Sequence, residues 1–205
     1  MRDDGAMSML VSGSERFTTE DLAHLSELVA RTWTEAAHLD WSVPAGTVDW
    51  SCAQTADHAV DCVYAPAFFL ASRRTDEYPE VELDLTLGRA ATPARLVESL
   101  RIATRMLIAV VHDAEPSVRS IIFHRPRPLT GAPHDFPPRA ALELILHAHD
   151  VCYGLGMRFD PPADLCLRLR EHTRPWPMWA YVWNELAFTN DPWGDLLVAS
   201  GRCRW

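Results

Sequence analysis

The stretch ALELILHAHD, residues 141–150, places four ionisable side chains inside an otherwise apolar helical pattern. Glu143 and His147 are four residues apart, so a helix projects both side chains from one face. His149 lies two residues from His147 and faces away, whereas Asp150, three residues after His147, is placed to orient its ring. A glutamate and a histidine at this spacing form either an ordinary helix pair or two ligands of a metal. The remainder of the sequence has to distinguish the two.

Long amphipathic patterns with capping residues predict a helical protein. Long helices are predicted at residues 19–38, from Ser51 through a kink at Pro66, from Thr92-Pro93 to about 112, and over about 138–153. Shorter helices are predicted after Pro161-Pro162 and from Asp191-Pro192 to Gly201. The sequence therefore predicts an all-α, up-down four-helix bundle with short additional helices. We expect a flexible tail at residues 1–16 and a single helical domain at residues 17–205.

Three segments depart from helical periodicity. Residues 80–87, EVELDLTL, alternate apolar and acidic side chains, which is typical of a strand and also of an extended loop. Residues 117–125, SVRSIIFHR, predict a short extended piece. Residues 126–138, PRPLTGAPHDFPP, form a long Pro-rich loop, and such loops inside compact domains often border sites.

The charge of the chain is acidic and argues against nucleic acid as a partner. Its formal net charge is −9, and all 19 basic residues are arginines without the clustering that phosphate contacts need. No apolar run approaches the ~18 residues of a membrane span, and the start lacks the apolar core of a signal peptide. The five cysteines form no CxxC pair and predict reduced thiols in a cytoplasmic protein. Cys62 and Cys152 fall within helical patterns, which favours a packing role.

A third metal ligand has to come from another helix, because a catalytic metal site has three protein ligands and one open position. The best candidate is His58 in QTADHAVDCV, which shares a helix face with Thr55, Cys62 and Ala65. Burying two imidazoles and a carboxylate together is costly unless a cation compensates, and bundle cores commonly hold such cations. The alternative is that each of these side chains is an ordinary hydrogen-bonded or half-exposed helix residue. Asp61 lies three residues after His58, as Asp150 lies three residues after His147, so Asp61 is placed to orient the ring of His58.

Three segments resemble motifs of the mycothiol-dependent maleylpyruvate isomerase family, within the DinB-like superfamily. They are LDWSVPAGTVDWSCAQTADHAVDCV (residues 39–63), ELILHAHDVCYGLG (residues 143–156) and DPWGDLLVASGR (residues 191–202). The last resembles the ending of the actinobacterial branch. The resemblance implies a DinB-type bundle with a metal triad of His58, Glu143 and His147. It also implies that the metal, often zinc, binds and activates a thiol such as mycothiol.

The resemblance leads us to expect a metal-dependent enzyme acting on a small molecule in detoxification or secondary metabolism. The two-domain isomerases carry a C-terminal α/β domain that contributes to the active site, and the sequence has no room for one. A thiol S-transferase is therefore expected rather than maleylpyruvate isomerisation. One alternative is a non-catalytic bundle with a vestigial metal site, whose Trp-rich run RPWPMWAYVW (residues 174–183) lines a pocket for an apolar ligand. Another is a regulatory interaction protein that forms a homodimer through a helix face.

Overall fold

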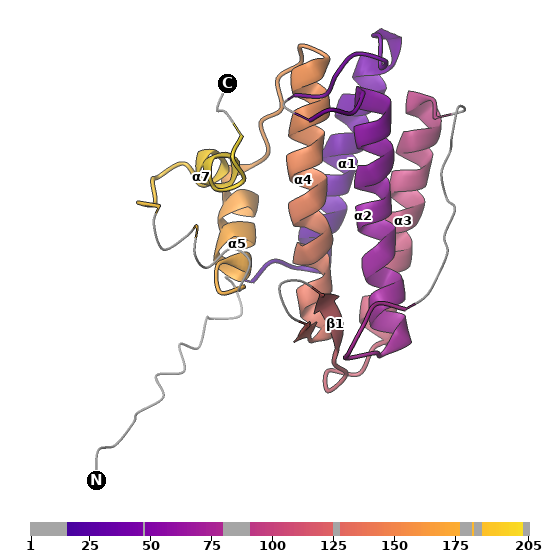
Figure 1. The fold of residues 1–205 in the computed structure, drawn as a ribbon, viewed down its shortest axis with the longest axis vertical. Helices are drawn as coiled ribbons and strands as arrows, with labels where there is room; N and C mark the ends of the chain where they lie inside the picture. The colour runs from indigo at the N-terminus through magenta and orange to yellow at the C-terminus, as the bar shows by residue number, and fades with distance from the viewer. Residues whose placement is uncertain are drawn as a thin grey trace.

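The computed structural model describes residues 16–46, 48–79, 91–124, 128–176, 182 and 186–202. In this part of the chain the protein is mainly helical, with one two-stranded antiparallel sheet (Figure 1). Its elements are α1 (Thr19–Glu35), η1 (Ala36–His38), α2 (Cys52–Ser72), α3 (Pro93–Asp113), β1 (Ser120–Phe123), β2 (Leu129–Gly131), η3 (Pro133–Asp135), α4 (Phe136–Gly154), α5 (Ala163–Thr173) and α7 (Pro192–Ala199). The mainly helical structure of these residues is compatible with the predicted all-α class. The predicted tail at residues 1–16, apart from its last residue, and the strand pattern at residues 80–87 lie outside them.

The starts of the long helices lie at the capping residues that the sequence offers. Thr18 accepts a hydrogen bond from the backbone of Asp21, and Ser51 does so from Gln54, each within a reciprocal capping box. Thr92 caps α3 just ahead of a proline at its first position. These side chains satisfy backbone N–H groups that have no partner within the helix, so they fix where each helix begins. Helix α2 continues through Pro66 to Ser72.

The four long helices share one apolar core. α2 packs against α3 and α4, and α1 packs against α3 and α4, so the four lie side by side (Figure 1). Each contributes fully buried apolar side chains, such as Trp33, Val63, Leu100 and Ile145. The apolar face of each helix loses its contact with water in this arrangement, which is the main favourable contribution to folding.

The directions of the helices follow from contacts between their ends. Thr19 at the start of α1 lies 3.1 Å from Nε2 of His112 at the end of α3, so these two helices are antiparallel. Cys52 at the start of α2 lies against Val151 near the end of α4, so these two are also antiparallel. The C-terminal ends of α2 and α3 lie together, because Arg73 and Asp113 line one groove. α2 and α3 therefore run parallel, and the four helices do not alternate strictly up and down.

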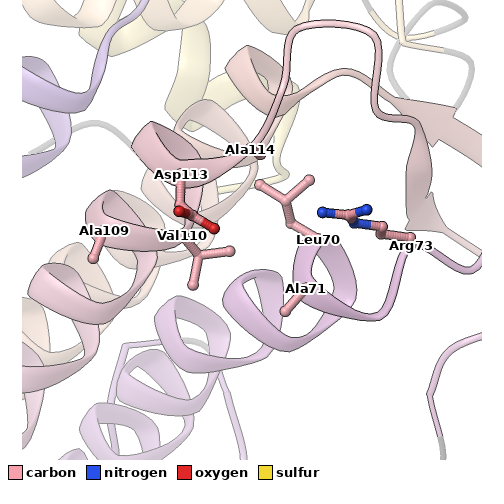
Figure 2. A pocket seen from close by; sticks show the side chains of 7 residues that line it. All are labelled: Leu70, Ala71, Arg73, Ala109, Val110, Asp113 and Ala114. Carbon is pink, nitrogen blue, oxygen red and sulfur yellow. The ribbon is translucent and has the colours of Figure 1, made fainter.

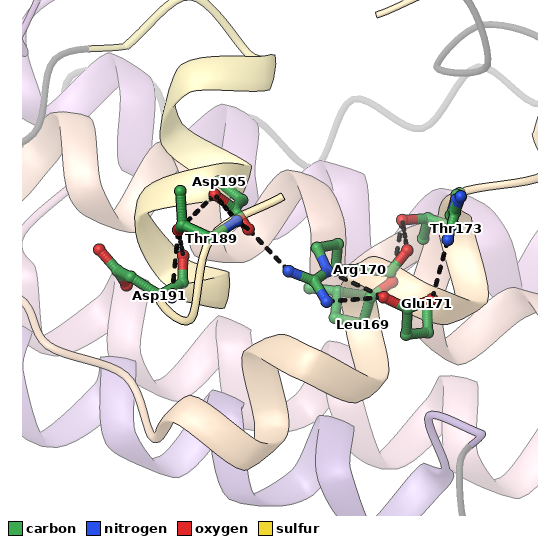
Figure 3. A network of polar contacts seen from close by, with 8 residues as sticks. Leu169, Arg170, Glu171, Thr173, Thr189, Asp191 and Asp195 are labelled. Atoms are coloured by element: carbon green, nitrogen blue, oxygen red, sulfur yellow. Dashed lines mark hydrogen bonds and ion pairs between the residues drawn. The ribbon is translucent and has the colours of Figure 1, made fainter. Parts of the chain in front are cut away.

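α5 and α7 form a smaller layer beside α4 (Figure 1). A buried ion pair connects them, in which Nη1 of Arg170 donates to Oδ2 of Asp195 at 2.6 Å (Figure 3). The backbone and hydroxyl of Thr189 also donate to Asp195, at 3.1 Å and 2.8 Å. Because removing one partner of a buried ion pair costs about 3–5 kcal/mol, this network holds α7 and Thr189, which precedes it, against α5.

Among the described residues, no helix has the length and apolar character needed to cross a membrane.

Candidate metal centre

The three predicted ligands come together where α2 and α4 cross. The rings of His58 and His147 lie edge to face, with centroids 5.0 Å apart and an interplanar angle of 77°. Oε2 of Glu143 lies 3.7 Å from Nε2 of His147. Within the described part of the chain, however, no three His, Cys, Asp or Glu side chains are already arranged around a common point as metal ligands. The three side chains are therefore adjacent, but the atoms that would bind a metal lie against other groups of the protein.

A loop held by the end of α4 brings His58 to this position. Backbone hydrogen bonds join Ala45 to Trp50 and Cys52 to Val43, at 2.9 Å and 2.8 Å, and so close the loop that leads into α2. Gly154 lies against this loop so closely that a Cβ there would be 2.3 Å from the carbonyl oxygen of Pro44. The absence of a side chain at this glycine lets the start of α2 approach the end of α4, which places His58 beside His147.

The histidine pair lies at the rim of the core rather than inside it. His58 and Cys62 are half-buried, while Thr55 on the same helix face is fully buried. The side chains of His147 and Glu143 are 12% and 32% exposed. The expected interior position of His58 is therefore only partly observed. A partly open site suits small-molecule access better than a fully enclosed one.

Arg139 and Trp50 were not identified from the sequence as neighbours of the predicted ligands, and Cys62 was placed only on the same helix face as His58. Nη1 of Arg139 donates to Oε1 of Glu143 at 2.9 Å, the ring of Trp50 lies 5.0 Å from that of His58, and Sγ of Cys62 lies 3.4 Å from Nε2 of His58. Arg139 and Cys62 are each four residues from the ligand that they contact. This helical spacing could therefore have identified both contacts from the sequence. Among the described residues, the polar contact shown for His58 is thus with Cys62. The spacing of three residues had instead favoured Asp61 as its partner.

Asp150 lies behind His147, as the spacing predicted. Its Oδ2 is 3.3 Å from Nδ1 of His147, an ion-pair distance without hydrogen-bond geometry. Arg202 donates to both carboxylate oxygens, at 2.8 Å and 2.6 Å. Burial alone raises the pKa of Asp150, but its contacts with His147 and Arg202 outweigh burial and hold that pKa below its usual value. Asp150 is therefore an anion that faces the back of the His147 ring.

His149 points to the other side of α4. It is buried, and its ring lies 5.6 Å from that of Trp193 in α7. This agrees with the expectation that His149 faces away from His147.

Burial and neighbouring charges set the protonation of the site. Burial lowers the pKa of His58, and the adjacent His147 lowers it further, so the imidazole is neutral at neutral pH. Burial raises the pKa of Cys62 to about 12, and the charge of Glu143 acts in the same direction. Without a metal the thiol of Cys62 is therefore protonated, while the neutral imidazole of His58 has one ring nitrogen whose lone pair can accept a hydrogen bond, a cation or a proton.

A second histidine pair lies at the start of α4, in the Pro-rich segment. Oδ1 of Asp135 lies 3.0 Å from Nε2 of His172 and 3.7 Å from Nε2 of His134. Burial raises the pKa of Asp135, but the hydrogen bond with His172 and the charge of His134 outweigh it and lower that pKa. Trp176, part of the Trp-rich run, packs against His172 with ring centroids 6.0 Å apart. Most other residues of that run, 177–181 and 183, lie outside the described residues.

An open groove lies at the opposite end of α2, between the C-terminal turns of α2 and α3. Its lining is apolar apart from Arg73 and Asp113, which stand on opposite sides (Figure 2). Leu70, at its floor, follows His58 by 12 residues of helix, or about 18 Å along the axis. This groove is therefore separate from the histidine pair.

Comparisons with protein-family models, with curated proteins and with solved structures find no significant match. The resemblance to the mycothiol-dependent isomerase family accordingly rests on the three sequence motifs.

Proposed function

We propose that this protein is a metal-dependent thiol S-transferase whose divalent metal, zinc by preference, is held by His58, Glu143 and His147. The observation that carries the proposal is the contact between two imidazoles from different helices beside a carboxylate. These are the ligand types of catalytic zinc sites that keep one position open. The proposal includes a DinB-like arrangement of α1–α4, a cytoplasmic location and mycothiol as the thiol, as the sequence motifs imply.

The residues present fit such a metal. A histidine has to be neutral to bind a metal, and the lowered pKa of His58 favours the neutral form. Glu143 adds the negative charge that a divalent cation needs, and Arg139, which now neutralises it at 2.9 Å, can turn away along its flexible side chain. A bound zinc would supply the positive charge that deprotonates a coordinated thiol at neutral pH.

The surrounding side chains have roles that do not depend on the metal being present. Asp150, held by Arg202, lies 3.3 Å from Nδ1 of His147, and the other ring nitrogen, Nε2, lies on the side of Glu143. Trp50 covers the outer side of His58 and is 45% exposed, so it offers an aromatic surface at the mouth of the site. An apolar electrophile can pack on such a surface.

The proposal is tested by metal analysis and a transfer assay on protein purified without chelator or nickel resin. Wild type should carry near-stoichiometric metal and transfer mycothiol to members of a panel of electrophiles. His58→Ala should lose both properties. His149→Ala, which alters a histidine on the far side of α4, should keep its metal, with helicity checked by circular dichroism.

Two outcomes would contradict the proposal. Equal metal loss in both variants would mean that the wrong histidine has been chosen. Full metal occupancy without thiol binding would instead favour the non-catalytic, apolar-ligand alternative.

A further inference from the structure

We propose that Cys62 is a fourth protein ligand of the metal, so that a thiolate of the chain itself occupies the position left open by the other three residues. This inference rests on the proposed function, because it requires that His58, Glu143 and His147 bind a metal.

The geometry that carries the inference is a matched pair of helix spacings. α2 presents His58 and Cys62 four residues apart, and α4 presents Glu143 and His147 four residues apart. The two helices are antiparallel and in contact, so the two pairs face each other across one interface. Sγ of Cys62 lies 3.4 Å from Nε2 of His58, and Oε2 of Glu143 lies 3.7 Å from Nε2 of His147. Both separations are close to those between neighbouring ligands of a tetrahedral ion with bonds of about 2.0–2.3 Å.

Cys62 differs from the cysteines that serve only in packing. Cys152 and Cys166 are buried within their helices, and no imidazole contact is shown for either among the described residues. Cys62 is only partly buried, contacts an imidazole, and lies near the charges of both Glu143 and Arg139. A thiol needs no such neighbours to fill a gap in a core, whereas a metal ligand needs other donors beside it. A metal-binding role for Cys62 would make use of these neighbours, which the packing role favoured by the sequence does not require.

The chemistry of ligation balances with a single proton. The S–H bond of Cys62 breaks, a sulfur–metal bond forms, and the proton passes to the buffer. His58 gives up its contact with the thiol and uses the same nitrogen lone pair for the metal. The resulting ligand set of two imidazoles, a carboxylate and a thiolate favours zinc or cobalt over magnesium or manganese. An external thiol then has to displace Cys62 before it can be activated.

The test is cobalt(II) titration of the full chain, followed by absorption spectroscopy. Wild type should bind one cobalt ion and show a thiolate-to-cobalt charge-transfer band in the near ultraviolet, besides the visible bands of tetrahedral cobalt. Cys62→Ser should still bind cobalt through the other three ligands but lack the charge-transfer band. Its zinc affinity should fall by more than the roughly 10–100-fold that loss of a residue orienting a ligand costs, and zinc binding should release one proton fewer than in wild type.

Cys166→Ala is the matched control, because it removes a thiol from α5, and it should keep the charge-transfer band. A band that persists in Cys62→Ser, or cobalt binding to wild type without the band, would overturn the role of Cys62 and leave the three-ligand metal site standing. If wild type binds no cobalt or zinc at all, the proposed function fails and this inference fails with it.

Discussion

His147 shows how one residue can be held from two directions. Glu143 lies at its Nε2 and Asp150 at its Nδ1, and Asp150 is in turn held by two bonds from Arg202. A ring with acidic neighbours at both nitrogens has a restricted orientation, which lowers the conformational cost of ligand binding. The spacing within residues 141–150 was enough to predict Glu143 and Asp150 as partners of His147.

Asp135 gives a prediction for the dependence of stability on pH. Burial alone would raise its pKa, but the hydrogen bonds from His172 and the Ala132 backbone and the charge of His134 together hold that pKa below the ordinary value of 3.8. A carboxyl with a depressed pKa stabilises the fold fully above the unfolded value, and this contribution is lost as pH falls through the folded value. Asp135→Asn should therefore be less stable than wild type at about pH 7, with the difference shrinking toward about pH 2.

Urea denaturation of both proteins across this range measures the effect. Equal differences in unfolding free energy at both ends of the range would show that the charge of Asp135 does not stabilise the fold.

The contact between the end of α4 and the loop before α2 is the element on which the site depends. Adding a methyl group at Gly154 would place it against the backbone of Pro44 and Ala45, which cannot turn aside as a flexible side chain can. Gly154→Ala should destabilise the protein by about 1–3 kcal/mol, as overpacking usually does, and should separate His58 from His147. Gly156→Ala is the matched control. It meets no atom within 4 Å, and its positive φ of 68° alone should cost about 1 kcal/mol.

Thermal and urea denaturation compare the stabilities of the two glycine variants, and zinc affinity reports on the site. A Gly156→Ala variant that loses more zinc affinity than Gly154→Ala would show that the close approach of loop and helix does not position His58.

The boundaries of the elements were largely predictable from sequence because their causes are local. Thr18, Ser51 and Thr92 cap helices within three residues of themselves, and periodic apolar residues mark the buried faces. Arg202 illustrates the limit of this reasoning. It is 52 residues from Asp150, and no spacing rule connects an arginine after α7 with a carboxylate on α4. Only the folded arrangement of α5 and α7 brings them together.

For the whole molecule, the parallel course of α2 and α3 was not predictable from the helical patterns. Helix patterns specify which face is buried but not in which direction a helix runs. The connection at residues 73–92 leaves both directions open, because about twenty residues can span a helix of 21 residues, about 32 Å long. In contrast, α2 and α4 contact each other in antiparallel directions. This contact brings His58 of α2 beside Glu143 and His147 of α4 and so forms one candidate site.

The central claim, that His58, Glu143 and His147 bind a metal, is tested most directly by anomalous diffraction from crystals grown with zinc. We predict one strong anomalous peak between α2 and α4, within bonding distance of both imidazoles and the carboxylate. His58→Ala crystals grown in the same way should lack it. No peak at this position with saturating zinc, or a peak only at His134, Asp135 and His172, would contradict the account.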